Sequence, residues 1–444
     1  MARKQNFCSR LYALLSGHMP VLNMSSRAPG SVDFLLILVS LVLTKLGDLL
    51  INPKTVLAWL GASAGVPASL IACLVPIRES GSMVPQSAIG SWLRRFPLRR
   101  SIWVSGSVAQ GLCVVAMALA LLILEGQPAG LALVCLLSVF SIARAFCSVT
   151  VKDIQGKTVP KGQRGRLSGW ASTIAGAATA VITVMFFMGE REPALLLYVT
   201  LLMIAAVAWF CAATAFHYVH EPPSAVDNAR FSAVAAFSNL HLLWTDPLLR
   251  RFVLARCLFL GSALAAPFFT LLAFQQSESA WLFGSIMLAS SIASLVSANF
   301  WGRLSDRSSK AVILSAGTTA SATCLLFGGL NVFLPDLISS AWLYPVGFFV
   351  LSIAHAGIRL GRSTYLLDIA EGNQRTDYVS VSNTFVGLVL LPAGAVTALT
   401  SMLSSGAVIM LLGTLAAAGV WVARGLPDVS EATKETPIMT ASRK

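Results

Sequence analysis

The feature that most constrains this chain is a succession of apolar runs, each long enough to cross a lipid bilayer as a helix. The hydrocarbon core of a bilayer requires about 20 consecutive apolar residues in a helix. Runs of that length recur from residue 34 to residue 423, separated by short polar segments. The chain is 56% hydrophobic and 11% charged, whereas soluble domains carry about 25% charged residues. The sequence therefore predicts an all-α integral membrane protein.

The apolar runs predict twelve transmembrane helices, six in each half of the chain. The first bundle, residues 34–216, has spans at 34–51, 67–90, 102–124, 130–151, 168–188 and 194–216. The second bundle, residues 252–423, has spans at 252–274, 280–301, 311–333, 341–363, 379–402 and 405–423. A longer polar linker, 217–251, joins the bundles, and polar tails cover 1–33 and 424–444.

The distribution of cations predicts the orientation of these helices. Most of the 32 lysines and arginines lie in the tails and in loops of one parity, while loops of the other parity hold only Lys54 and Arg191. By the positive-inside rule, the cation-rich side faces the cytoplasm. We therefore expect a multi-pass protein of the cytoplasmic (inner) membrane with both termini cytoplasmic. The net charge of +13 then reflects insertion and contact with lipid headgroups, and it does not indicate a nucleic-acid partner.

The second half of the chain repeats features of the first. A short charged loop, Gly302–Lys310, joins two spans, and a weaker copy begins at Gly90, 212 residues earlier. The tetrapeptide Ser-Ile-Ala-Arg ending at Arg144 recurs as Ser-Ile-Ala-His ending at His355, at an offset of 211 residues. Such repeats are typical of transporter folds. We therefore expect two pseudo-symmetric six-helix bundles.

The repeat also bears on the second span, for which two registers are open. Hydropathy alone favours 56–76, which leaves Arg78 and Glu79 in a cytoplasmic loop. The repeat favours 67–90, because Gly302 ends the eighth span and Gly90 holds the corresponding place in the first half. We adopt the second register, and it brings Arg78 and Glu79 near mid-membrane.

The loop between spans eight and nine resembles a motif of the major facilitator superfamily of transporters. The pattern G-x-L-x-D-R-x-x-R/K is matched by Gly302, Leu304, Asp306, Arg307 and Lys310. The resemblance implies two bundles that rock around a central cavity, a monomer, and a loop that holds the halves together at the cytoplasmic face. It also implies that Asp306 faces the positive end of the helix beginning near residues 166–169. The first-half copy departs from the pattern, because Arg94 stands at the aspartate position.

Charged residues in and beside these two loops are candidates for gating. We expect Arg95 to pair with Asp153 and Arg307 to pair with Asp368, one pair in each half. The alternative is that these are solvated loop charges. The full set of gating candidates is Gly90, Arg94, Arg95, Arg99, Asp153, Gly302, Asp306, Arg307, Lys310 and Asp368.

Ionisable side chains inside the spans are candidates for a substrate and proton pathway, because such groups are costly in lipid and normally face a cavity or a partner. Lys45 and Asp48 are three residues apart on one helical face, at about mid-depth. In the resembled family, spans one, four, seven and ten line the cavity. The candidates are Lys45, Asp48, Arg78, Glu79, Arg144, His355 and Arg359, with Arg362 expected at the membrane interface.

These residues leave several readings open. A carboxylate in a dry site has a raised pKa and can carry a proton, which favours Asp48 or Glu79 for coupling. Alternatively, Lys45–Asp48 and Arg78–Glu79 neutralise one another or cross-pair as structural ion pairs, and His355 serves helix packing or hydrogen bonding. We expect a secondary active transporter of a small anionic or zwitterionic solute, coupled to protons and surrounded by membrane lipid. The alternatives are an exporter of amphipathic compounds and a transport-inactive homologue that acts as a membrane sensor or assembly partner.

Enzyme and cofactor signatures are missing from the sequence. It has no phosphate-binding P-loop, and the serine in Gly165–Gly169 is not at the centre of a G-x-S-x-G elbow. The eight cysteines are scattered without a C-x-x-C pair, and the five histidines lack metal-ligand spacing. We therefore expect no enzymatic activity, no metal and no cofactor.

Overall fold

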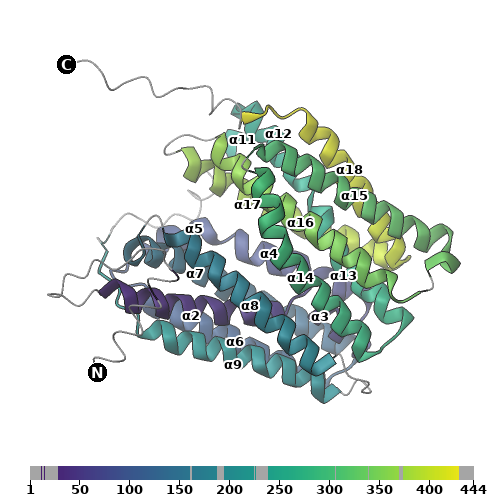
Figure 1. Cartoon of the computed structure of the whole chain (residues 1–444), viewed down its shortest axis with the longest axis horizontal. Helices are drawn as coiled ribbons and strands as arrows, with labels where there is room; N and C mark the ends of the chain where they lie inside the picture. Colours follow the sequence, from purple (N-terminus) through teal and green to yellow (C-terminus); the bar gives the residue numbers. More distant parts are fainter. Residues whose placement is uncertain are drawn as a thin grey trace.

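The computed structural model describes residues 12, 15, 29–160, 163–187, 195–224, 226, 239–305, 307–338, 340–369 and 374–429. All regular secondary structure in this part of the chain is helical (Figure 1), so the predicted all-α membrane fold is confirmed. Ten helical stretches among these described residues are long and apolar enough to cross a membrane. Two further crossings, the first and the second, are broken helices.

The first half of the chain forms six crossings. The first crossing comprises α2 (Pro29–Leu50) and α3 (Val56–Ser63), and the second comprises α4 (Ala68–Met83) and α5 (Gln86–Leu93). The next four are α6 (Arg100–Ile123), α7 (Gly126–Thr158), α8 (Arg164–Phe187) and α9 (Leu195–His217).

The second half begins with the short elements η2 (Asn239–His241) and α11 (Leu242–Thr245). The seventh crossing comprises α12 (Pro247–Leu258) and α13 (Leu260–Gln276). It is followed by α14 (Ala280–Ser305), α15 (Ser309–Phe333), η3 (Pro335–Ile338), α16 (Leu343–Asp368), α17 (Gln374–Ser401) and α18 (Ser405–Arg424).

The register chosen for the second span is confirmed, and the end predicted for the first span is wrong. The first crossing does not stop at residue 51, because α3 continues it after a break at residues 52–55. Gly65 then ends α3 with a φ of +71°, and the N–H of Val66 bonds back to the carbonyl of Gly61 at 2.8 Å. Glycine adopts this left-handed conformation without steric cost. Residues 56–76 therefore form no continuous helix, and α4 begins at Ala68.

The helices of the two halves pack in the same pattern. In the first half α6 contacts α7 and α9, and in the second half α15 contacts α16 and α18. Between the halves, α4 packs against α17, and α14 packs against α8. These two contacts are related by exchange of the halves, as expected for a repeat. Figure 1 shows the first half in the lower part of the view and the second half above it.

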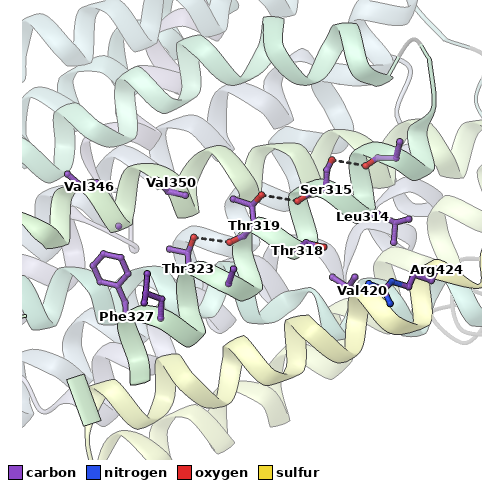
Figure 2. Close-up of a pocket in the computed structure, with 14 residues that line it drawn as sticks. Leu314, Ser315, Thr318, Thr319, Thr323, Phe327, Val346, Val350, Val420 and Arg424 are labelled. Atoms are coloured by element: carbon purple, nitrogen blue, oxygen red, sulfur yellow. Dashed lines mark hydrogen bonds between the residues drawn. The ribbon is translucent and has the colours of Figure 1, made fainter. Parts of the chain in front are cut away.

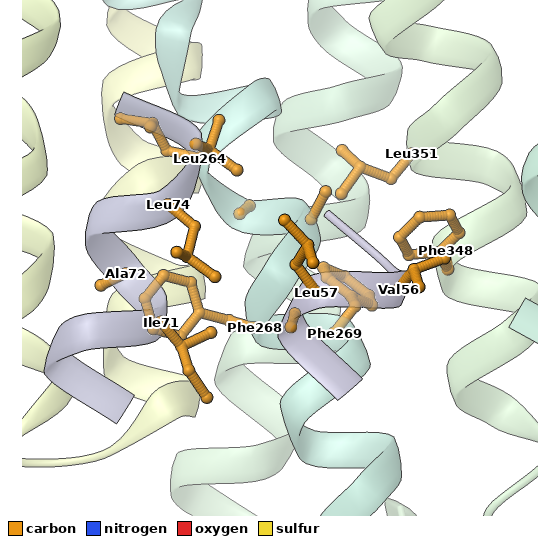
Figure 3. Close-up of a cluster of buried hydrophobic side chains, with 14 of the residues drawn as sticks. Val56, Leu57, Ile71, Ala72, Leu74, Leu264, Phe268, Phe269, Phe348 and Leu351 are labelled. Atoms are coloured by element: carbon orange, nitrogen blue, oxygen red, sulfur yellow. The ribbon is translucent and has the colours of Figure 1, made fainter. Parts of the chain in front are cut away.

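The two sides of the molecule differ. We call the side on which α2 begins and α18 ends the terminal face; in Figure 1 it runs from the lower left, where α2 begins, to the top, where α18 ends. On the opposite face α3 packs directly against α13. Apolar side chains fill this contact (Figure 3), among them Val56 and Leu57 of α3 and Phe268 and Phe269 of α13, all 1% exposed or less.

Beside this contact lies a cluster of rings that we call the aromatic seal. Its members are Trp59, Phe187, Tyr198, Phe274 and Phe283. The Trp59 ring lies edge-on to Phe274 at 5.1 Å, and Phe283 contacts Phe187 at 4.9 Å and Tyr198 at 5.2 Å. Trp59 donates its indole N–H to the Tyr198 hydroxyl at 3.1 Å. Because Phe274 and Phe283 belong to the second half and the others to the first, the seal joins the halves on the face opposite the terminal face.

Glycines allow the close approach of helices between the halves. A Cβ atom added at Gly394 in α17 would lie 2.6 Å from the ring of Pro76 in α4, and one at Gly387 would lie 2.7 Å from Val84. At Gly176 in α8, the nearest atom would be a methyl of Leu295 in α14 at 3.5 Å. Small residues let helix backbones approach in this way in membranes.

Replacement of Gly394 by alanine is expected to destabilise the contact between α4 and α17, because the proline ring is rigid and cannot move aside. Overpacking of this kind costs about 1–3 kcal/mol. The matched control is Gly329→Ala in α15, where no atom lies within 4 Å of the added Cβ. Thermal unfolding of the purified protein should show a lower midpoint for Gly394→Ala only. Equal midpoints for both variants would contradict the close contact.

Asp246 predicts a pH dependence of stability. Its carboxylate caps α12 by accepting the N–H groups of Leu248 at 2.9 Å and Leu249 at 3.0 Å, and it also accepts the hydroxyl of Tyr378 in α17. Burial alone raises the pKa of Asp246, but the Tyr378 hydroxyl and the two amides outweigh it and lower the pKa. A carboxyl with a lowered folded-state pKa stabilises the fold above its unfolded pKa of about 3.9, and this stabilisation is lost as the pH falls through the folded-state value.

We therefore expect Asp246→Asn to unfold at a lower temperature than the wild type at neutral pH. This difference should vanish at a pH below the folded-state pKa, because the wild-type carboxyl is then neutral as well. Unfolding midpoints of both proteins across the acid range check this. A constant difference at all pH values would assign the effect to packing instead.

Candidate functional site

Asp48 is the centre of an ion cluster that joins three helices of the first half. Its Oδ1 lies 2.8 Å from Nη2 of Arg78 in α4, and its Oδ2 pairs with Nη2 of Arg144 in α7. The Asp48 side chain is 14% exposed and the Arg144 side chain 30%. Of the structural ion pairs considered from the sequence, the cross-pair between Asp48 and Arg78 forms, whereas the described residues form no Lys45–Asp48 or Arg78–Glu79 ion pair. One carboxylate thus binds two arginines from neighbouring helices, which leaves an excess of positive charge.

Lys45 points to a different helix from Asp48. Its Nζ donates to the carbonyl of Ser168 at 3.0 Å and to Oγ of Ser172 at 2.5 Å, both in α8. The three-residue spacing places Lys45 and Asp48 at neighbouring positions of one helix. Their side chains nevertheless bind different helices: Lys45 binds α8, and Asp48 binds α4 and α7.

Arg256 in α12 makes the equivalent contact in the second half. Its Nη1 donates to Oγ of Ser382 at 2.5 Å and its Nη2 donates to Oδ1 of Asn383 at 2.8 Å, both in α17. Lys45 and Ser172 are 127 residues apart, as are Arg256 and Asn383. Arg256 was not among the candidates taken from the sequence. The repeat contains a signal for it, because the offset of 211 residues that relates Arg144 to His355 also relates Lys45 to Arg256.

A cavity of about 650 Å³ lies between the halves on the terminal-face side of the aromatic seal. Its cationic lining consists of Arg256 in α12 and Arg359 and Arg362 in α16. The other lining residues are Met83, Ser172, Ser294, Ser297, Gly302, Ala356, Leu360, Ser363, Leu366, Val379 and Asn383. Among the residues that the structure describes, the lining combines three arginines with hydroxyl and amide groups and includes no acidic side chain. Arg362, expected at the membrane interface, lines this cavity instead.

Glu79 lies near this cationic region without a direct bond. It is half-buried in α4, and its nearest charged neighbours are Lys54, Arg78, Arg362 and Arg359. The described residues give its carboxylate no hydrogen bond and no ion pair. Glu79 therefore differs from Asp48, whose two oxygen atoms are both occupied.

His355 connects the two halves. Its Nε2 lies 3.1 Å from Nζ of Lys54, and its Nδ1 lies 3.0 Å from Oγ of Ser262 in α13. The sequence places Lys54 in a predicted loop outside the membrane. The break between α2 and α3 brings Lys54 into the interior instead. Pro53 is the sequence signal for this helix break.

The gating candidates of the first half form a charged network at the terminal face. Arg99 Nη1 pairs with Asp153 Oδ1 at 2.5 Å, and Lys157 lies 2.6 Å from the other oxygen of Asp153. Lys157 also pairs at 2.9 Å with Glu221, which accepts the backbone N–H of Arg99 at 2.8 Å. The predicted Arg95–Asp153 pair is therefore wrong, because Arg99 and Lys157 occupy both oxygens.

The remaining candidates of the first-half loop lie at its surface. Arg94 and Arg95 are exposed at the end of α5. Gly90 has open space around it, since an added Cβ would meet only a methyl of Val149 at 4.0 Å.

The candidates of the second-half loop are arranged differently. Gly302 lines the cavity, Arg307 is exposed, and Lys310 is half-buried. Asp368 accepts the hydroxyl of Ser309 at 2.9 Å, and within the described part of the chain it forms no ion pair with Arg307, so that predicted pair is wrong. Asp306 lies outside the described residues.

A second hollow lies on the surface of the second half, away from these charges. It measures about 890 Å³ and is lined by α15, α16 and α18. Figure 2 shows that the hydroxyls of Ser315, Thr319 and Thr323 bond along α15 itself. The groove therefore presents mainly methyl groups, with Arg424 as its single charged lining residue. It fits the lipid-facing surface better than a polar substrate site.

Neither a protein-family model nor a curated protein matches the sequence. Solved structures match over most of the chain. A variant of the nucleoside transporter NupG is 13% identical, with 88% of this chain and 99% of that chain covered and a TM-score of 0.68. A D-xylose–proton symporter is 14% identical, with 90% and 98% covered and a TM-score of 0.67. The human organic anion transporter MFSD10 (TETRAN) is 15% identical, with 89% and 100% covered and a TM-score of 0.54.

Asp48→Asn is expected to destabilise the protein, because it leaves Arg78 and Arg144 beside each other without a counter-charge. Removing one partner of a fully buried pair costs about 3–5 kcal/mol. Partial exposure of these side chains screens the charges, and we expect about 1–3 kcal/mol here. Thermal unfolding of the purified protein measures the loss.

Adding Arg144→Gln to Asp48→Asn should recover part of this stability, because one unpaired charge is then removed. A single variant with wild-type stability but no proton-coupled uptake would contradict the structural role and make Asp48 the proton carrier.

Proposed function

Since the chain has the fold of the major facilitator superfamily, we propose that it is a secondary active transporter that moves a small anionic solute through the cavity between its halves. Three observations support the proposal. The cavity lies between two six-helix halves, it holds polar groups suited to a hydrophilic solute, and the charged residues among its described lining are all cationic. The cationic lining is the observation that favours an anion as the substrate.

The charge balance supports an anionic substrate. Cations inside a membrane are stable only beside a counter-charge, a polar partner or water. Both oxygens of Asp48 bind Arg78 and Arg144, so Asp48 is not available to Arg359 or Arg362. Within the described part of the chain, neither of these two arginines has a hydrogen bond from its side chain to the protein. A carboxylate or phosphate group of a substrate supplies the missing partner, because guanidinium groups bind such anions in bidentate geometry.

The arrangement of the halves supports transport by alternating access. The aromatic seal closes one side, while the cavity lies toward the terminal face. With the cation-rich loops in the cytoplasm, this is an inward-facing state of a monomer in the cytoplasmic membrane, with both termini cytoplasmic. Rocking of the halves about the contacts of α4 with α17 and of α8 with α14 exposes the cavity to the other side.

Glu79 is the better candidate for coupling to protons. Both oxygens of Asp48 already bind arginines, so we assign Asp48 a structural role. Glu79 has neighbouring cations but no direct partner, and its environment changes when the halves move apart, because Lys54 belongs to the first half and Arg359 to the second. The solved D-xylose–proton symporter is coupled to protons by its own description. We propose the same kind of coupling here, through Glu79.

Arg359→Gln and Arg362→Gln are each expected to weaken anion binding. A hydrogen bond to a charged group contributes about 1.5–3 kcal/mol, which corresponds to roughly a ten- to hundredfold loss of affinity. The concentration dependence of counterflow in proteoliposomes, with labelled phosphate and labelled dicarboxylates, measures this loss. The control is Arg424→Gln, which removes the same charge from the outer groove and should leave exchange unchanged.

Two results would overturn the anion proposal. Exchange of neutral or amphipathic solutes that persists in the arginine variants would favour the exporter of amphipathic compounds. A folded protein that exchanges no solute across a broad panel would favour the transport-inactive sensor.

A further inference from the structure

The bond between Lys54 and His355 lies between the cavity and the aromatic seal. Lys54 is five residues before Trp59 of the seal, and His355 is four residues, one helical turn, before Arg359 of the cavity. The Lys54 backbone is held as well: its N–H donates to Oδ1 of Asn52 at 3.0 Å, and its carbonyl accepts the hydroxyl of Thr270 in α13 at 2.8 Å. Lys54 therefore contacts the second half through both its main chain and its side chain.

The hydrogen bonds around His355 determine which of its nitrogens carries the proton. Ser262 donates its single hydroxyl proton to the carbonyl of Phe259 at 2.9 Å. Toward Nδ1 of His355, at 3.0 Å, Ser262 therefore acts as an acceptor, and Nδ1 is the protonated nitrogen. Nε2 is then free to accept a proton from the Lys54 ammonium at 3.1 Å. The bridge between the halves thus joins a charged donor to a neutral acceptor.

A neutral imidazole is a weak partner for an ammonium in this environment. The charged groups around Lys54 are Glu79 and Arg78 in α4 and Arg359 and Arg362 in α16, three cations and one carboxylate. The bond from Lys54 to His355 has one ionised partner, whereas a bond from Lys54 to an anion has two, and their Coulomb attraction adds to the hydrogen bond. An anion bound beside Arg359 therefore competes effectively with His355 for the Lys54 ammonium.

We propose that Lys54 is the residue that couples the substrate to the seal: an anionic substrate draws the Lys54 ammonium from His355 and releases the polar bridge between the halves. This inference rests on the proposed function and deepens it. Without substrate, the bridge adds to the closure made by the aromatic seal. With substrate, Lys54 becomes part of the anion site. The sealed side then loses the side-chain bond from Lys54 to His355 and keeps the backbone bond from Lys54 to Thr270. The anion thereby shifts the populations of the two states, because it binds the released state better.

Two variants with different expected behaviour test the proposal. His355→Phe removes the acceptor, so the bridge is lost without any anion. Lys54→Gln keeps a neutral donor for Nε2 but removes the charge that an anion attracts. The control is Lys152→Gln, which removes a charge from an exposed site in α7.

The measurement is a distance across the sealed face by pulsed electron paramagnetic resonance on the full chain. Spin-labelled unnatural amino acids replace the exposed residues Gln127 and Leu337, one in each half, so that the native cysteines remain. The probes are inorganic phosphate and succinate. We expect either anion to add a longer distance in the wild type and in the control. His355→Phe should raise the long-to-short ratio by about ten- to hundredfold without anion, the range for one lost hydrogen bond of a charged group. Lys54→Gln should keep the short distance, and neither anion should add a longer distance in this variant.

The outcomes separate the two proposals. Wild-type distances in His355→Phe, or a wild-type anion response in Lys54→Gln, overturn the role of the bridge and leave the proposed function standing. If calorimetry shows that a probe binds the wild type but the distance does not change, the role of the bridge is likewise overturned and the proposed function stands. Binding of neither probe overturns the anion site itself. If His355→Phe does not give a monodisperse protein, His355→Leu removes the same acceptor and is read in the same way.

Discussion

Charge buried in a membrane must find a partner, and this constraint organises the interior of the protein. The two halves meet it in different ways. In the first half, Asp48 binds Arg78 and Arg144 within one bundle. In the second half, Arg359 and Arg362 face the cavity without such a carboxylate. The first half thus gives its two arginines a shared carboxylate, while the second half presents cationic charge to the cavity.

This difference is built on a symmetric frame. Lys45 bonds to Ser172 and Arg256 bonds to Asn383 across the same helix pair in each half, with the same separation along the chain. The contacts tie the first span of each half to its fifth. The symmetric frame therefore accounts for the packing, and His355 stands at the position equivalent to Arg144, so the second half has an imidazole where the first has a guanidinium. This imidazole is the acceptor that Lys54 uses.

The fold could be predicted from the sequence because lipid imposes length, hydropathy and charge asymmetry on every crossing. The register of the second span followed from the repeat, which outweighed hydropathy. The partners of the charged side chains did not follow. The spacing of Lys45 and Asp48 describes one helix, whereas their bonds depend on the rotation of that helix against α4, α7 and α8. Arg99 and Arg95 are neighbours in one loop, and only the folded loop decides which reaches Asp153. Lys54 was assigned to a loop because the break in the first crossing was missed.

The same geometry explains how the halves can separate on one side and remain joined. The contact of α4 with α17 depends on glycines that bring backbones close to Pro76 and Val84, and such small-residue contacts hold two helices together while one tilts against the other. The aromatic seal is different, because rings that interdigitate across the halves must part completely. The aromatic rings alone have no charge with which an anionic substrate in the cavity could interact. A polar bridge beside them, made by a charged lysine on a neutral histidine, gives an anion in the cavity a direct means of weakening the closure.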